Sequence, residues 1–153
     1  MRRLPRTPAV SDSDCQFCQI ADGARLVAVV ARGPDWIAFF PEQPATVGHT
    51  IVIPTSHVQD LWENKDVLAS VMPGVWDVGR AIRASLRPDG MNCITSAGEA
   101  AEQSVPHLHI HVVPRRFGDD FGKIWPPKQS IDPEALESAM TRIQRELPSE
   151  GDE

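Results

Sequence analysis

Three histidines stand at alternate positions in the segment SVPHLHIHVVP, residues 104–114. They are His107, His109 and His111, and the chain holds 5 histidines in all. The residues between and after them are apolar. Residues two apart in a β-strand point to the same face of the sheet, so a strand here places the three imidazoles on one face and the apolar side chains on the other. The spacing therefore predicts a strand with a histidine face.

Such a row of imidazoles has three chemical uses. It can form a polar, solvent-exposed sheet face, or a metal site that leaves one coordination position open. It can also divide the work, with one histidine holding a metal, one acting as a nucleophile and one binding the anionic group under attack. Imidazole has a reference pKa of about 6.5, so much of it is unprotonated and nucleophilic near neutral pH. The rest of the sequence favours the third use.

The cysteines supply a second cluster of reactive groups. Cys15 and Cys18 form the segment CQFC, and the third cysteine is Cys93. Two thiolates and two imidazoles are a common closed ligand set for structural zinc, and His57 and His107 are placed to complete it. A free buried pair or a redox couple is the alternative for CQFC. We expect Cys93, within a strand, to be a buried and inert thiol.

The elements that must position these groups follow from hydrophobic periodicity and turn residues. A helix with one apolar stripe is expected over 65–86, with Pro73 predicting a kink or a later helix start. A second helix is expected over 132–147, with Asp132 as the N-cap and Pro133 at its first position. The expected strands, besides the histidine strand, are 26–31, 36–40, 49–54 and 91–96. This order predicts an α+β fold with an antiparallel sheet.

Length and charge limit the classes of function. The chain has 153 residues, which suggests one domain, over 15–147. The net charge of −6 argues against a protein that coats nucleic acid or binds an anionic membrane. Residues 1–14 carry arginines without an apolar run after them, so we expect a flexible arm rather than a secretory signal, and a cytoplasmic protein. Residues 148–153 are expected to form an acidic tail.

The segment HLHIHVV fits the histidine triad pattern in full, with apolar residues at every position between and after the histidines. The sequence resembles the histidine triad (HIT) superfamily, and within it the short bacterial members close to the Hint branch. Four further segments follow in the order found in that family: CQFCQI, GHTIVIPTSH, AGEAAEQSVPH and PRRFGDDFGKIW. The resemblance covers about residues 15 to 125.

This resemblance implies a fold and an activity. It implies a five-stranded antiparallel sheet with two helices, dimerising into a larger continuous sheet. It implies a hydrolase or transferase that acts on the α-phosphate of purine nucleotides or their conjugates: phosphoramidates, adenylates or dinucleoside polyphosphates. His109, the middle histidine, would attack the phosphorus and form a nucleotidyl-histidine intermediate. No catalytic metal is then required, and zinc would be structural.

The resemblance also assigns roles to residues. The zinc ligands it implies are Cys15, Cys18, His57 and His107. The catalytic and phosphate-facing residues it implies are His109, His111, His49 and Ser104, with Gln103 also beside the phosphate oxygens. Ser96 falls in the substrate-binding region, where relatives often carry Asn. Pro41 stands where relatives carry an Asp that binds the ribose hydroxyls, so altered ribose recognition is expected, with Glu42 as the available substitute.

The sequence is also compatible with two other functions. The first is a non-catalytic nucleotide-binding or interaction protein that keeps the triad and uses a dimer surface for partners. The second is a mononuclear zinc hydrolase that uses His107, His109 and His111 together as ligands.

Overall fold

The structure is a computed structural model that describes residues 13–148. It consists of two units, the first ending at Phe121 and the second beginning at Gly122. Residues 1–12 of the expected arm and residues 149–153 of the expected tail lie outside the described part of the chain.

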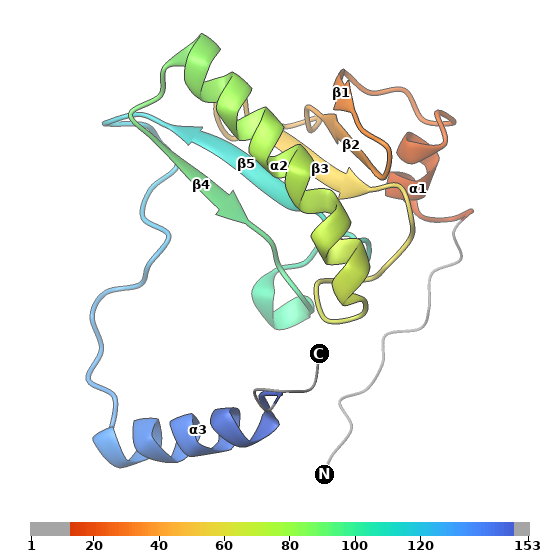
Figure 1. The fold of residues 1–153 in the computed structure, drawn as a ribbon. Coiled ribbons are helices and arrows are strands. Elements are labelled where there is room, and N and C mark those ends of the chain that lie inside the picture. Colours follow the sequence, from red (N-terminus) through yellow and green to blue (C-terminus); the bar gives the residue numbers. More distant parts are fainter. Residues whose placement is uncertain (1–12, 149–153) are drawn as a thin grey trace. The chain divides into compact units, whose positions relative to one another are not determined.

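The first unit is built on an open antiparallel sheet with the strand order β1-β2-β3-β5-β4 (Figure 1). The strands are β1 (Val29–Arg32), β2 (Trp36–Phe39), β3 (Thr50–Pro54), β4 (Gly90–Ile94) and β5 (Ile110–Arg115). The predicted α+β class with a five-stranded antiparallel sheet is therefore confirmed. Strands β1 and β4 form the two open edges.

The histidine strand is shorter than predicted, because β5 begins only at Ile110. The residues before it form their hydrogen bonds with loops instead of a neighbouring strand. The backbone N–H of Leu108 donates to the carbonyl of Val58 at 2.7 Å. The hydroxyl of Thr95 donates to the carbonyl of His109 at 2.8 Å. Two of the three triad histidines thus lie in an irregular segment that leads into the strand.

Helix α2 (Lys65–Leu86) has the predicted bounds. Its start is fixed by Asn64, whose side chain accepts hydrogen bonds from the N–H groups of the first turn at 2.9 and 3.2 Å. The later start expected from Pro73 is wrong, because the helix runs through this residue. Pro73 and Ala69, whose carbonyl loses its partner there, are both exposed, so water can satisfy that oxygen.

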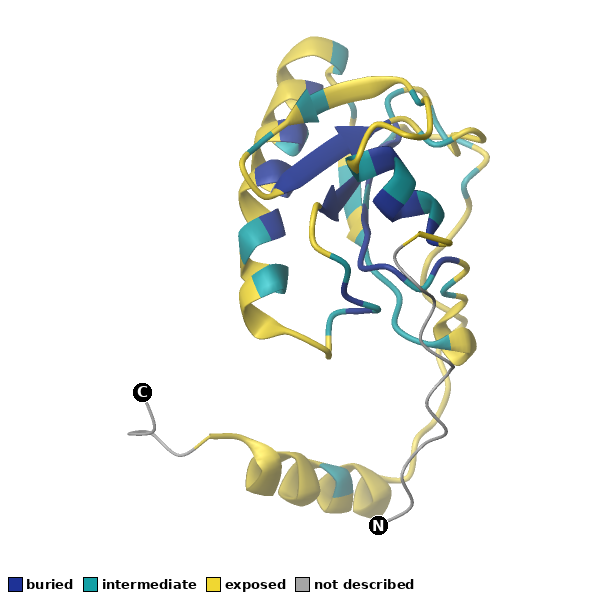
Figure 2. Cartoon of the chain, turned by 90° about the vertical axis from the view of Figure 1, so that its right-hand side faces the viewer, coloured by how far each residue is buried: buried dark blue, intermediate teal, exposed yellow. Residues whose placement is uncertain are grey.

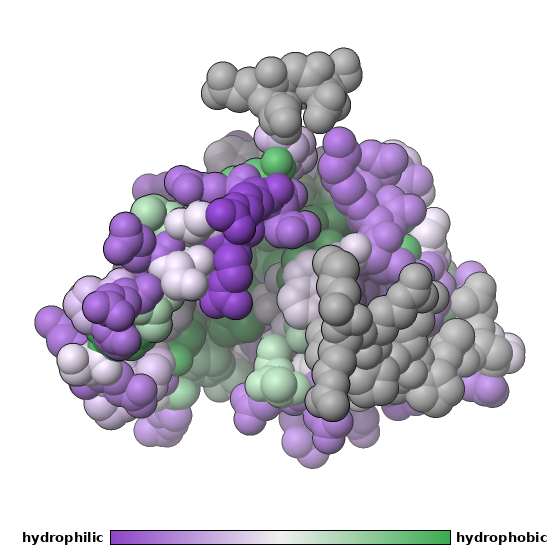
Figure 3. Space-filling view, turned by 90° about the horizontal axis from the view of Figure 1, so that it is seen from below, coloured by the Kyte–Doolittle hydropathy of each residue, from purple (hydrophilic) through white to green (hydrophobic). Residues whose placement is uncertain are grey.

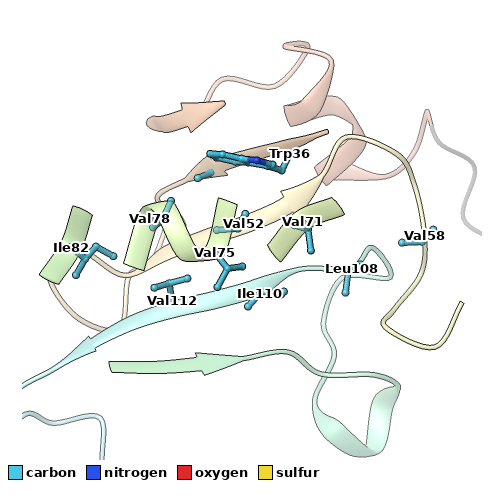
Figure 4. Close-up of a cluster of buried hydrophobic side chains, with 11 residues drawn as sticks. Trp36, Val52, Val58, Val71, Val75, Val78, Ile82, Leu108, Ile110 and Val112 are labelled. Carbon is cyan, nitrogen blue, oxygen red and sulfur yellow. The ribbon is translucent and has the colours of Figure 1, made fainter. Parts of the chain in front are cut away.

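The core lies on both faces of the sheet. One face packs against α2 through a cluster that includes Trp36, Val52, Val75, Ile110 and Val112 (Figure 4). The opposite face packs against α1 (Gln16–Ala21), a short helix that the sequence did not predict. This second cluster comprises Cys15, Phe17, Cys18, Ile20, Ile37, Phe39, Ile51, Ile53 and Val105. Strands β2 and β3 are buried along their whole length as a result (Figure 2).

The second unit contains α3 (Pro133–Glu146), as predicted. The Asp132 side chain accepts a hydrogen bond from Glu134 N–H at 3.1 Å, which confirms the N-cap.

Hydrophilic side chains dominate the molecular face in Figure 3, with smaller groups of hydrophobic ones among them. Within residues 13–148, no helix combines the length and the apolar character that a membrane span requires.

Candidate active site and metal centre

Two cysteine and two histidine side chains lie close together in the first unit. One ligand atom from each of Cys15, Cys18, His57 and His107 lies within 4.8 Å of all the others. The Cys15 sulfur is 3.4 Å from Nδ1 of His107, and the Cys18 sulfur is 3.2 Å from Nδ1 of His57. Tetrahedral zinc with metal–sulfur and metal–nitrogen bonds of usual length separates its ligand atoms by about 3.3–3.8 Å. The four side chains therefore fit a metal ion.

The tautomer of His107 also suits a metal ligand. Its Nε2 lies 3.1 Å from the carbonyl of Pro54, which can only accept, so Nε2 carries the proton. Nδ1, the atom that faces the sulfurs, is then left with its lone pair. A ligand histidine held by a backbone carbonyl in this way is typical of protein metal sites.

The backbone carbonyl of His107 orients the ring of His109. Its Nδ1 lies 2.7 Å from the carbonyl of His107, so Nδ1 carries the proton and Nε2 holds the free lone pair. His109 as a residue is 4% exposed. Among the described residues, every buried side-chain nitrogen or oxygen has a hydrogen-bond partner, whereas Nε2 of His109 has none. This nitrogen therefore reaches the protein surface.

His49 and His111 form a hydrogen-bonded pair next to it. The N–H of Ala45 donates to Nδ1 of His49 at 3.0 Å, so the His49 proton is on Nε2. That Nε2 donates to Nδ1 of His111 at 2.9 Å. In the neutral state His111 then carries its own proton on Nε2, where it is a hydrogen-bond donor for a ligand. The rings of His109 and His111 are 5.1 Å apart.

The three rings of this group are held in the neutral state. Burial lowers the pKa of His49 and of His109, although the hydrogen bond to the His107 carbonyl acts in the opposite direction for His109. Burial, followed by the charges of His109 and His49, lowers the pKa of His111 to about 4. At neutral pH the ring of His109 therefore stays neutral, and the lone pair of its Nε2 is available to react.

Gln103 stabilises the loop that precedes the triad. Its amide oxygen accepts from Gly98 N–H at 2.8 Å, and its amide nitrogen donates to the carbonyls of Gln59 and Val105 at 2.7 and 3.1 Å. Both amide protons are thus used within the protein, so a phosphate contact from Gln103 would require one of these bonds to be exchanged. Ser104, the next residue, is exposed.

A pocket of about 470 Å³ is lined by α1, by residues 25–28 before β1, by the end of β2 with the residues after it, and by Ile51 of β3. It adjoins the triad through Phe17, which lines the pocket and contacts the His109 ring. Its apolar lining includes Phe17, Ile20, Phe39 and Ile51, and its polar lining is Gln16, Arg25 and Glu42. Pro41 also lines it. This volume is in the range of small-molecule sites. Ser96 is not part of this lining; it is half-buried and follows β4.

The sequence did not indicate Phe17 as part of the site, and the environment predicted for Cys93 is wrong. Phe17 lies within the CQFC segment, and its ring contacts the rings of His107 and His109 edge-on at 5.9 and 5.3 Å. An aromatic residue between two ligand cysteines is the signal that could have identified it. The expected burial of Cys93 is wrong: it lies on the edge strand β4 and is exposed, since no further strand covers it.

Comparison with known proteins places this site in a family. The profile of the HIT domain matches residues 26–118, which contain the histidine segment. The chain belongs to the HIT family. This HIT protein is 37% identical over 139 residues to the protein hit of Bacillus subtilis, covering 89% of this chain and 96% of that one. It is also 30% identical over 137 residues to the adenosine 5′-monophosphoramidase of Schizosaccharomyces pombe, covering 87% and 98%.

Solved structures show the same fold. A HIT family protein from Bacillus subtilis superposes with a TM-score of 0.80 at 34% identity, covering 89% of this HIT protein and 99% of that chain. A zinc-bound histidine triad family protein from Mycobacterium smegmatis gives a TM-score of 0.68 at 31% identity, covering 88% and 99%.

Proposed function

We propose that this HIT protein is a nucleotide-binding hydrolase or transferase that acts on the α-phosphate of nucleotide conjugates through a nucleotidyl-histidine intermediate. The observation that carries the proposal is the state of His109. Its Nδ1 proton is bound by the His107 carbonyl at 2.7 Å, which leaves the lone pair on the surface-facing Nε2. A relative that is 30% identical is named as an adenosine 5′-monophosphoramidase, which supports the same chemistry here.

In the first step, Nε2 of His109 attacks the α-phosphorus in line with the leaving group. A nitrogen–phosphorus bond forms, and the bond from phosphorus to the departing amine or phosphate breaks. The leaving atom takes the electron pair and a proton, which the hydroxyl of Ser104 is suited to relay from water. The ring becomes positively charged, and the His107 carbonyl that accepts from Nδ1–H stabilises this charge.

In the second step, water or another acceptor attacks the same phosphorus. The nitrogen–phosphorus bond breaks and its electron pair returns to Nε2, while the acceptor loses its proton to solvent. A nucleoside monophosphate is the product when the acceptor is water. The Nε2–H of His111, whose position is fixed by His49, is the donor for a phosphate oxygen in both steps.

The pocket of about 470 Å³ is suited to the nucleoside of this substrate. Its apolar side chains can contact a purine base on both faces. Glu42 is the carboxylate in its lining, and Pro41 cannot accept a hydrogen bond from a ribose hydroxyl through its side chain. We expect ribose recognition that depends on Glu42.

Zinc is the metal we propose for Cys15, Cys18, His57 and His107, because two thiolates and two imidazoles are a closed tetrahedral set. Bound there, it would have a structural role and leave His109 unliganded. The wild-type protein should contain one tightly bound zinc ion per chain. The double variant Cys15→Ala, Cys18→Ala should lose it, whereas the control Cys93→Ala should keep it by elemental analysis. Zinc retained by the double variant would favour a site made of triad histidines instead.

We also propose that two copies form a homodimer and that the protein acts in the cytoplasm. The open edge of β4 supports the dimer, because it lies beside an apolar groove of about 590 Å³. Exposed Met72 and Trp76 line this groove together with Cys93.

Turnover of a fluorogenic adenosine phosphoramidate tests the proposed function. The zinc-loaded wild type should release the amine, and His109→Asn should not, because it lacks the nucleophilic nitrogen. Nucleotide binding without any turnover by the wild type would instead support a non-catalytic binding protein of the same fold.

A further inference from the structure

Helix α1 connects the metal centre to the pocket. It spans only six residues, and its N-cap position, Cys15, makes no side-chain capping bond. So short a helix is not stable on its own, so its position depends on tertiary contacts. These contacts are the sulfurs of Cys15 and Cys18 at the metal centre and the buried side chains of Phe17 and Ile20. The same two apolar side chains line the pocket.

Phe17 contacts both parts of the site. It is 7% exposed, and its ring meets the ring of His107, a proposed metal ligand, edge-on at 5.9 Å. It meets the ring of His109, the proposed nucleophile, edge-on at 5.3 Å. A third edge contact, at 5.6 Å, joins it to Phe39 in the pocket wall. One side chain therefore contacts a ligand histidine, the nucleophilic histidine and the pocket.

The position of α1 is expected to change with metal occupancy. Without a cation, the two thiols can make only weak hydrogen bonds to the imidazoles of His57 and His107. A bound metal replaces these hydrogen bonds with two metal–sulfur bonds. The free energy of metal binding then stabilises the folded position of the segment that contains the two cysteines.

We infer that Phe17 is a positioning residue that couples metal occupancy to nucleotide binding, so that the metal centre regulates the pocket. This inference rests on the proposed function. When the metal holds α1, Phe17 and Ile20 form the pocket wall and Phe17 packs against the His109 ring. When the metal is lost, both side chains are released with α1 and nucleotide affinity falls.

Thermodynamic linkage gives the first test, with AMP and zinc as the probes. AMP affinity, measured by calorimetry, should fall at least about fivefold when zinc is removed by a chelator. Because coupling is reciprocal, saturating AMP should raise the zinc affinity of the protein by the same factor in competition with a chromogenic chelator. Equal AMP affinity with and without zinc would overturn the coupling. A loaded wild type that binds no AMP would overturn the proposed function itself.

The variant Phe17→Leu gives the second test and does not require metal removal. It keeps an apolar side chain and both cysteines, so one zinc per chain should be retained. AMP binding should weaken about two- to tenfold, and the linkage between AMP and zinc should shrink. The resonances of the His109 ring protons should also shift, because the edge-on aromatic contact is lost.

Phe117→Leu is the matched control, since Phe117 is 93% exposed and makes no part of the pocket lining. It should leave AMP affinity, linkage and the His109 resonances unchanged. A Phe17→Leu protein whose AMP affinity and linkage equal those of this control would overturn the role of Phe17, even if the coupling itself were observed.

Discussion

At the scale of single residues, each of the three triad histidines has a different hydrogen-bond partner on one ring nitrogen, and this partner decides which nitrogen carries the proton. The proton of His107 is held by the Pro54 carbonyl, which turns the lone pair toward the cysteines. The proton of His109 is held on Nδ1, which turns the lone pair outward on Nε2. His111 accepts from His49 and so presents a donor. Identical side chains at regular spacing thus acquire the properties of a ligand, a nucleophile and a hydrogen-bond donor.

The lowered pKa of His111 gives a prediction for NMR. Its ring-proton shifts should show no titration midpoint near 6.5 and should move only toward pH 4, because burial and the facing rings of His109 and His49 disfavour the charged form. The unfolded chain binds this proton below about pH 6.5, so His111 makes stability fall as pH drops from there toward 4. A midpoint near 6.5 for the folded protein would contradict the account.

The sequence predicted which side chains gather, but not their hydrogen bonds. The family resemblance, added to residue type and spacing, grouped Cys15, Cys18, His57 and His107, and the four side chains do lie together. The tautomer of His107 depends on the carbonyl of Pro54, and that of His111 on the ring of His49, both of which are distant in sequence. Asp119 pairs with Arg115 at 2.7 Å, and this bond holds the pKa of its carboxyl well below the usual range.

At the scale of elements, close packing of α2 on the sheet depends on a glycine. Gly74 directly follows Pro73 and is buried, and the Trp36 ring of β2 lies against its backbone. A Cβ built at Gly74 would lie 2.4 Å from that ring. Trp36 is 6% exposed, and in a close-packed core a shift of its ring disturbs the neighbouring side chains.

Gly74→Ala should therefore destabilise the protein by about 1–3 kcal/mol in urea unfolding, as overpacked cores do. Alanine gains about 1 kcal/mol of helix propensity over glycine, but the clash is the larger effect. Shrinking the ring should relieve it, so Trp36→Leu combined with Gly74→Ala should cost less than the sum of the two single changes. A Gly74→Ala protein more stable than wild type would show that Trp36 does not pack as described.

Elements with strong local signals were predicted better than those defined by tertiary contacts. The bounds of α2 follow from its apolar stripe, and α3 was predicted down to its Asp132 cap. Helix α1 was missed because its six residues have no periodic pattern long enough to detect. The start of β5 at Ile110 was missed because residues before it bond to loops, which only the fold brings near.

At the scale of the whole molecule, the first unit has an open sheet edge at β4 with an apolar groove beside it. Trp76 is 69% exposed in this groove, and Arg80 and Arg83 also line it. An exposed large apolar group beside an unpaired strand is unfavourable in a monomer and is commonly covered by association. The dimer implied by the family resemblance would extend the sheet at this edge.

The charge-introducing variant Trp76→Asp should turn the proposed dimer into a monomer in sedimentation equilibrium, because it places a carboxylate in the apolar groove. Trp62→Asp is the control, since Trp62 is 72% exposed and makes no part of the groove lining. It should remain dimeric. A wild type that sediments as a monomer at micromolar concentration, or a dimeric Trp76→Asp protein, would exclude this interface.

The most direct measurement of the central claim is the site of covalent modification. The zinc-loaded protein would be mixed with an adenosine 5′-phosphoramidate, quenched within the first turnover under conditions that preserve nitrogen–phosphorus bonds, and mapped by mass spectrometry. The account predicts one adenylyl group, attached to His109, and none on His109→Asn. Turnover by the wild type with no adduct at His109, or an adduct on another residue, would contradict it.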